Sequence, residues 1–174
     1  MSNLYKKTEL VTNVVIIAVA LLLGVVVVKR FLLSPRAPAP VKPIAAGIRI
    51  NLPDVEWAKS RQTLLVVLAQ GCRFCSESVP FYQRLAKEAL GRSDLQLVAV
   101  LPQSPAEGRK YLDELNVSIQ QVKQAELPSI QVAGTPTLIL VDSQGIVTHA
   151  WVGKLPAEQE EDVLRDLQCD NCGS

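Results

Sequence analysis

The four cysteines of this chain form two pairs, each with two residues between its members. The first pair is Cys72 and Cys75, and the second pair is Cys169 and Cys172. Two thiols at this spacing can interconvert between a dithiol and a disulfide. Two such pairs can also hold one metal ion through four thiolates. The residue types therefore restrict the chemistry to redox exchange at a cysteine pair or to metal binding.

The residues on either side of the first pair favour redox exchange. Residues 64–69 are apolar and partly β-branched, the pattern of a buried strand, and Gly71 interrupts that pattern. Cys72 is thus predicted at or just before the start of a helix, where unpaired N–H groups favour a thiolate. We interpret Cys72 as the attacking nucleophile and Cys75 as the thiol that resolves the mixed disulfide. Apolar residues then recur at helical spacing, at Val79, Tyr82, Ala86 and Ala89.

Composition narrows the classes of partner. The chain has 174 residues, 48% of them hydrophobic, which is enough for one domain and an additional apolar segment. The formal net charge is +1, so the charge gives no reason to expect a nucleic-acid partner. Neither cysteine pair is followed by histidine, so covalent haem attachment is not indicated. We expect no cofactor and no resident metal.

An apolar segment near the start predicts a membrane anchor. Residues 14–28 carry no charge, and residues 11–13 extend this stretch to about the length needed to cross a hydrocarbon core. We predict an N-terminal tail at 1–10, a single transmembrane helix at 11–33 in contact with lipid, and a Pro-rich linker at 34–46. A cleaved signal peptide is the main alternative. Counting basic residues on the two sides of the span leans toward a cytoplasmic C-terminal domain.

The remainder predicts an α/β domain at 47–168. Strands are expected at 95–101, 137–141 and 146–152, in addition to the strand before Cys72. Ser104, Pro105 and Glu107 have the spacing of a helix start, and a final helix is expected at 157–167. Asp142 to Gly145 is a turn sequence that joins the last two strands as a hairpin. The order is strand, helix, strand, helix, hairpin, helix, which favours a layered α/β fold.

Three features together resemble a known family. A C-x-x-C pair lies at a strand-to-helix junction, Pro80 follows Cys75 by five residues, and Thr135-Pro136 precedes the hairpin. This arrangement resembles the thioredoxin fold, and specifically the membrane-anchored TlpA/ResA-like thiol–disulfide oxidoreductases. The resemblance implies a thioredoxin-like sandwich, a central mixed sheet flanked by helices. It also implies a cis peptide bond at Pro136, with Thr135 and Pro136 binding an extended partner. Val66 stands where thioredoxin has a buried aspartate.

The function that follows is a membrane-tethered thiol–disulfide oxidoreductase. By resemblance, its soluble domain faces the extracytoplasmic side of a bacterial membrane and its partners are cysteine pairs of exported proteins. Arg73 favours a thiolate while Phe74 disfavours it by desolvation, so the direction of electron flow stays open. Two alternatives also stay open. One is a metal-binding or metal-delivery protein that uses both C-x-x-C pairs, and the other is a thioredoxin-fold interaction module without turnover.

Two further features have more than one interpretation. Glu77 is interpreted as a first-turn glutamate that complements the helix dipole, with proton transfer as the alternative. The C-terminal segment 169–174 contains the second pair, Cys169 and Cys172. This pair is either a passive local disulfide or a possible secondary redox pair that relays electrons to Cys72 and Cys75. Asp170 is expected to raise the thiol pKa values beside it, which argues against the tail as the primary nucleophile.

Overall fold

A computed structural model describes residues 16–17, 19–23 and 44–168 of the chain. The chain divides into two units, 1–39 and 40–174. In the first unit, residues 16–17 and 19–23 are helical, and their large hydrophobic side chains are exposed. Among the described residues, no helix has the length and hydropathy that crossing a membrane requires. The anchor predicted at 11–33 lies mostly outside the described residues and stays a prediction, as does most of the linker at 34–46.

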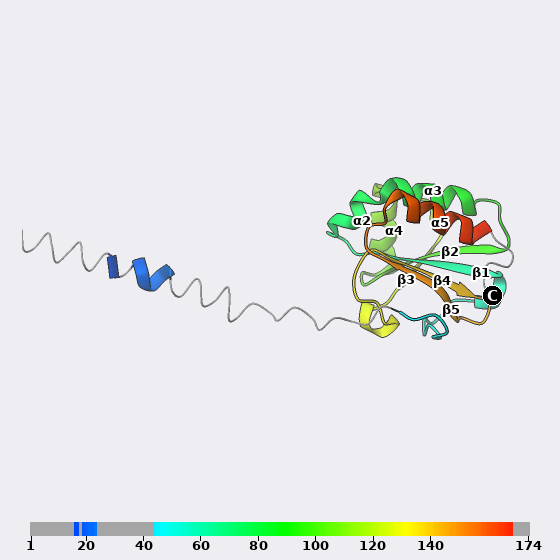
Figure 1. Cartoon of the computed structure of the whole chain (residues 1–174), viewed down its shortest axis with the longest axis horizontal. Helices are drawn as coiled ribbons and strands as arrows, with labels where there is room; N and C mark the ends of the chain where they lie inside the picture. Colours follow the sequence, from blue (N-terminus) through cyan, green and yellow to red (C-terminus); the bar gives the residue numbers. More distant parts are fainter. Residues whose placement is uncertain (1–15, 18, 24–43, 169–174) are drawn as a thin grey trace, which may run out of the picture. The chain divides into compact units, whose positions relative to one another are not determined.

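The second unit is built on a five-stranded mixed sheet with the order β3-β2-β1-β4-β5 (Figure 1). β1, β2 and β3 are parallel to one another, whereas β4 is antiparallel to both β1 and β5. The parallel strands place the carboxyl end of β1, and therefore the cysteine pair that follows it, at one end of the sheet. The strands are β1 Gln62–Val67, β2 Leu95–Leu101, β3 Gln121–Gln124, β4 Thr137–Asp142 and β5 Val147–Val152.

The helices gather on one face of this sheet (Figure 1). The connections from β1 to β2 and from β2 to β3 step in the same direction, so right-handed crossovers bring α3 and α4 to the same face. Short 3-10 helices and the segment that starts at Ile44 cover the other face. The helical elements are η1 Trp57–Lys59, α2 Arg73–Glu77, α3 Val79–Ala89, α4 Pro105–Glu114, η2 Leu127–Ile130 and α5 Ala157–Gln168.

The sheet separates two hydrophobic clusters. Leu64 and Val66 of β1 pack into the helix-covered cluster, and Leu65 and Val67 pack into the opposite one. Since β1 is buried on both faces, its last four residues, 64–67, are continuously apolar rather than alternating. Ile44 is already buried in the second cluster, so packed structure begins ahead of the predicted domain start at Gly47.

Several sequence predictions are confirmed. α4 begins with the predicted capping box, in which the Ser104 hydroxyl and the Glu107 backbone and side chain bond reciprocally. The β4–β5 hairpin is present, and Asp142 Oδ1 accepts hydrogen bonds from the backbone N–H groups of Gln144 and Ile146. One prediction is corrected at the cysteine pair. The single helix expected after the pair is two helices, α2 and α3, separated at Ser78.

The edge strand β3 was not predicted. Its four residues, Gln-Val-Lys-Gln, contain one apolar side chain, so they show no hydrophobic alternation. Tertiary contacts position it instead. An added Cβ at Gly108 of α4 would lie 2.8 Å from Val122 Cγ1, so the glycine allows α4 to approach β3 closely.

Candidate active site

Cys72 and Cys75 are joined by a disulfide bond, with their Cα atoms 5.2 Å apart. The chain leaves β1 and turns at Gly71, whose φ of +76° lies in the left-handed region that glycine adopts most easily. Cys72 is the N-cap residue of α2, as predicted, and its sulfur accepts a hydrogen bond from the backbone N–H of Cys75 at 3.1 Å. The same N–H can stabilise negative charge on Cys72 when the pair is reduced.

The two sulfurs differ in access. Cys75 is fully buried, whereas Cys72 is half-buried, and Phe74, two residues after Cys72, is 52% exposed. Disulfide exchange requires an in-line approach to a sulfur from solvent. Cys72 is therefore the sulfur of this pair that an external partner can approach.

Pro80 contributes to the break between α2 and α3. It lies at the start of α3 and has no N–H to donate to the carbonyl of Ser76, as the sequence predicted. The Ser78 N–H and hydroxyl both donate to the Phe74 carbonyl, at 3.1 and 2.9 Å. α2 ends at Glu77, with Ser78 as its C-cap, so the pair lies at the start of a short helix.

The loop before β4 faces the cysteine pair. The Thr135–Pro136 peptide bond is cis, which confirms the prediction. The Thr135 carbonyl oxygen lies 3.4 Å from Cys72 Sγ. On its other side the loop is held to the end of β5, because the Gly153 N–H donates to the Pro136 carbonyl at 2.7 Å. The structure thus brings together all four of the predicted residues Cys72, Cys75, Thr135 and Pro136.

The surroundings of Cys75 are apolar. Val66 lies in the same buried cluster, and among residues 44–168 the buried polar side chains are Thr63, Ser78, Gln96 and Thr137, with no carboxylate. The buried ionisable neighbours in this cluster are Tyr82 and Tyr111. Burial raises the pKa of Tyr82 well above its ordinary value and also raises the pKa of Tyr111. Both phenols therefore stay protonated at neutral pH and cannot act as the base for Cys75.

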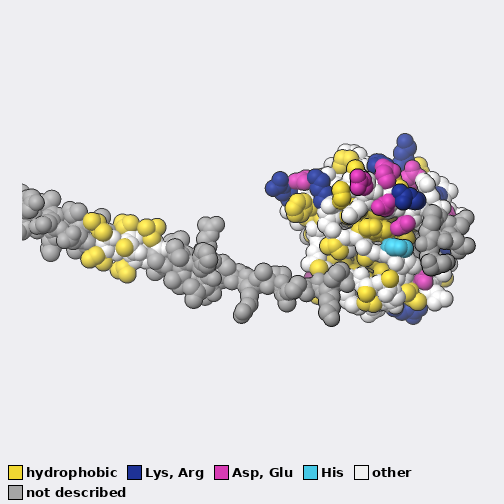
Figure 2. Space-filling view, in the orientation of Figure 1, with side chains coloured by type: hydrophobic (Ala, Val, Ile, Leu, Met, Phe, Trp, Pro, Cys, Tyr) yellow, Lys and Arg dark blue, Asp and Glu magenta, His cyan; other side chains and the backbone are white. Residues whose placement is uncertain are grey.

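Three charged side chains lie along α2 and beside it. Glu77 Oε1 accepts from Arg73 Nε at 2.8 Å, and Glu77 Oε2 accepts from Lys154 Nζ at 2.9 Å. The hydrogen bond from Lys154, followed by that from Arg73, holds the pKa of Glu77 below its ordinary value. Figure 2 shows basic, acidic and hydrophobic side chains side by side at the end of the domain where α2 lies.

The position of Glu77 corrects its sequence-based interpretation. It is the last residue of α2, so it does not complement the positive end of this helix dipole. Sequence reasoning also missed Lys154, which is 77 positions away from Glu77 and follows β5. No local pattern marks this pair, because the contact depends on how β5 and α2 pack.

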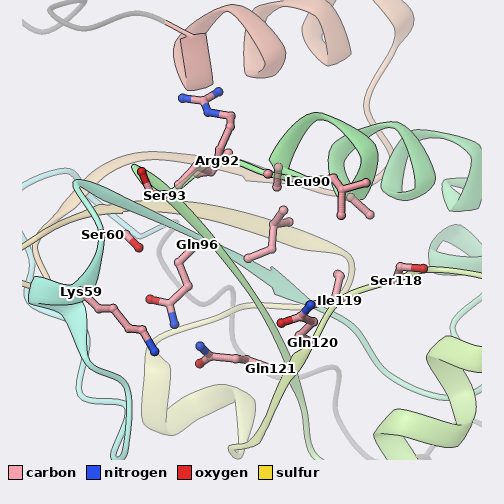
Figure 3. Close-up of a pocket in the computed structure, with 15 residues that line it drawn as sticks. Lys59, Ser60, Leu90, Arg92, Ser93, Gln96, Ser118, Ile119, Gln120 and Gln121 are labelled. Carbon is pink, nitrogen blue, oxygen red and sulfur yellow. The ribbon is translucent and has the colours of Figure 1, made fainter.

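The pocket in Figure 3 is separate from the cysteine pair. It has a volume of about 420 Å³ and lies where β2 and β3 begin, close to the end of α3. Because the parallel strands place Cys72 beyond the opposite end of the sheet, this pocket is no part of the thiol site. Its polar lining includes Lys59, Arg92, Gln96 and Gln121.

The second pair, Cys169 and Cys172, lies outside the described residues. The element before it is described, and α5 ends at Gln168. The Leu167 carbonyl accepts from Arg92 Nη2 at 2.8 Å, near the start of β2. Within the described part of the chain, no group of three or more Cys, His, Asp or Glu side chains is arranged to hold a metal ion. A four-thiolate site from both pairs would include residues outside the described part of the chain, so it stays an alternative.

Comparison with solved structures identifies the fold. A putative thiol:disulfide interchange protein DsbE from Chlorobium tepidum matches with a TM-score of 0.56 and 22% identity, over 71% of this chain and 96% of that one. A thiol-disulfide isomerase from Corynebacterium glutamicum matches with a TM-score of 0.55 and 17% identity, over 77% and 99%. A thiol:disulfide interchange protein from Bacteroides sp. matches with a TM-score of 0.54 and 18% identity, over 79% of this chain and 95% of that one.

These similarities confirm the predicted thioredoxin-like α/β fold, with a mixed sheet and helices packed on it. No family model and no curated protein sequence matches the chain. At these identities the likeness establishes the fold. The chemistry must be argued from the cysteine pair and its surroundings.

Proposed function

We propose that the protein is a thiol–disulfide oxidoreductase with Cys72 as nucleophile and Cys75 as resolving thiol. The observation that carries this proposal is the bonded pair itself. The accessible sulfur caps a helix and faces the Thr135–Pro136 loop, while its partner is buried. The fold is also that of solved thiol–disulfide interchange proteins.

The exchange proceeds in two steps. In the reduced protein, the Cys72 thiolate attacks one sulfur of a substrate disulfide, and the other substrate sulfur leaves as a thiolate that takes up a proton. Cys75 then loses its proton and attacks Cys72 Sγ, which releases the second substrate thiolate. The substrate gains two electrons, and the Cys72–Cys75 disulfide forms. The reverse sequence oxidises a substrate dithiol.

The partner is a cysteine-containing protein segment bound in extended form. The Thr135 carbonyl lies against Cys72, and Pro136 follows it in the same loop, so a peptide that presents its cysteine to Cys72 also meets this loop. Phe74 and Val152, which are 52% and 49% exposed, offer apolar contacts at the same end of the domain. Val152 pairs with Thr137, next to Pro136, which places it beside the loop.

We further propose that residues 11–33 anchor the domain on the extracytoplasmic side of a bacterial membrane, where it acts on exported proteins. The uncharged apolar run supports the anchor. A dithiol–disulfide couple also suits a compartment in which disulfides persist. A reporter fused after Ser174 tests this topology. Activity of a periplasmic reporter and silence of a cytoplasmic one are expected, and the reverse result would support the count of basic residues instead.

Two measurements on the purified chain test the main proposal against its alternatives. We expect exchange with a disulfide-bonded protein such as insulin, and we expect that Cys72→Ser abolishes it. Stoichiometric zinc bound through both pairs, with no exchange, would favour the metal-binding protein. Neither metal nor exchange would favour the interaction module.

A further inference from the structure

Glu77 links two parts of the site that are far apart in sequence. Through Arg73 it contacts the residue next to Cys72, and through Lys154 it contacts the segment after β5. That segment is in turn bonded to the Thr135–Pro136 loop through Gly153. The loop returns to Cys72 through the Thr135 carbonyl. These contacts form a closed ring that includes Cys72. Glu77 is the one anionic side chain among the residues named in this ring.

The charges of this ring act on the chemistry at Cys72. Reduction of the disulfide creates a negative charge when the Cys72 thiol ionises, so nearby cations favour the reduced form and nearby anions oppose it. Arg73 and Lys154 are cationic, and Glu77 cancels one of the two. Glu77 follows Cys72 by five residues, a rise of roughly 7–8 Å along the axis of α2, which is within one Debye length at physiological salt.

We propose that Glu77 lowers the reduction potential of the Cys72–Cys75 pair by offsetting the positive charge of Arg73 and Lys154. Glu77 does not touch the sulfurs, so it is a positioning residue for charge and not a catalytic residue. This inference rests on the proposed exchange function, because a potential matters only if the pair cycles between dithiol and disulfide.

The size of the effect follows from the exposure of the three side chains. Arg73 is 84% exposed, Lys154 47% and Glu77 32%, so water screens each of them strongly. A unit charge at this distance in a largely aqueous environment changes the equilibrium about two- to fivefold. For a two-electron couple this corresponds to about 10–20 mV.

Charge substitutions give predictions of opposite sign. Glu77→Gln leaves two cations, so the equilibrium constant with glutathione should shift about two- to fivefold toward the dithiol, and the pKa of Cys72 should fall. Lys154→Met leaves one cation and one anion, so the shift should be toward the disulfide. The double variant Glu77→Gln/Lys154→Met restores the net charge of the ring and should return the equilibrium close to that of the unmodified protein.

The experiment is equilibration of the full chain in glutathione redox buffers, followed by alkylation and peptide mass spectrometry. Peptides that contain Cys72 and Cys75 are read separately from those that contain Cys169 and Cys172. Glu161→Gln is the matched control, because Glu161 forms an ion pair with Arg84 in α3 and this ion pair shares no residue with the ring. This control should leave the equilibrium unchanged.

The outcomes separate this inference from the proposed function. If the Cys72–Cys75 pair equilibrates reversibly with glutathione but its equilibrium constant does not change in Glu77→Gln, the inference alone is overturned. Shifts in the same direction for Glu77→Gln and Lys154→Met would also overturn it, because that pattern indicates loss of the Glu77–Lys154 ion pair and not a change of charge. A pair that does not titrate reversibly would overturn the proposed function instead.

Discussion

The Thr135 carbonyl oxygen lies 3.4 Å from Cys72 Sγ, although the two residues are 63 positions apart. The contact exists because β1 and β4 are neighbours in the sheet, with Val67 paired to Thr137. The end of β1 that leads to the cysteine pair therefore meets the start of β4 that follows Pro136. This juxtaposition makes one surface that can both bind a peptide and exchange its cysteine.

Phe74 should contribute to substrate binding more than to the intrinsic reactivity of the pair. Phe74 lies two residues after Cys72 and its side chain is 52% exposed, so Phe74→Ala removes an apolar surface without opening the core. We expect kcat/KM with a protein substrate to fall about 5- to 30-fold, the effect of losing roughly 1–2 kcal/mol of contact. The rate with a small dithiol should change far less. Leu90→Ala is the control, since Leu90 is 78% exposed and far from Cys72. An equal loss with both substrates would contradict the assignment.

Asp94 should make the stability of the fold sensitive to acid. The hydrogen bond from Arg92 is the main cause that holds the pKa of Asp94 below its ordinary value of 3.8. A carboxyl whose pKa is lower in the folded than in the unfolded state stabilises the fold above the unfolded pKa, and this contribution is lost as the pH falls.

Asp94→Asn should therefore lower the free energy of unfolding at pH 7. The difference from the unmodified protein should shrink from about pH 5 downward. Urea unfolding at several pH values measures this difference. A gap that stays constant down to pH 2 would show that the ionised carboxylate is not its source.

The second cysteine pair should not exchange with Cys72 of the same chain. Leu167 is held near the start of β2 by Arg92, and α5 ends at the opposite end of the sheet from α2 (Figure 1). Six residues of β1 span about 20 Å, and Cys72 lies beyond them. A fully extended chain of two residues from Leu167 to Cys169 spans about 7 Å, and one of five residues to Cys172 spans about 17 Å. Both lengths are shorter than the span of β1, even before the path around the core is counted.

The relay within one molecule therefore requires the last turn of α5 to unwind, which would expose the buried Leu164 and Leu167. This geometry favours the local disulfide over the internal relay. We expect Cys169→Ser/Cys172→Ser to leave exchange at Cys72 unchanged. Any mixed disulfide between the tail and Cys72 should join two chains and depend on protein concentration. A concentration-independent bond within one chain, seen by mass spectrometry, would restore the relay.

The sequence predicted those parts of the site that depend on local patterns. The apolar run of β1, Gly71, the helix start and Pro80 are close in sequence, so they place Cys72 at a helix N-terminus without knowledge of the rest. The cis bond at Pro136 came from resemblance, because no local pattern in Thr135-Pro136 specifies it. The contact between Cys72 and the Thr135–Pro136 loop depends on the order of the strands within the sheet. The order of elements along the chain indicated this only in outline.

Other features were not accessible from the sequence. β3 has one apolar residue in four and forms because α4 places it beside β2. The bond between Glu77 and Lys154 depends on the packing of α2 against the end of β5. The second face of the sheet is covered by irregular segments that have no periodicity to detect, including Ile44 and Val132.

Trapping of mixed disulfides tests the central claim most directly. Cys72 is the accessible sulfur and Cys75 the buried one. In Cys75→Ser, Cys72 should still attack a substrate disulfide, but the mixed disulfide should persist because the resolving thiol is missing. Incubation with a disulfide-bonded protein, followed by non-reducing electrophoresis and peptide mass spectrometry, should show adducts at Cys72 in Cys75→Ser. Cys72→Ser should give none at Cys75. Equal trapping at both positions, or trapping at Cys75 alone, would contradict the account.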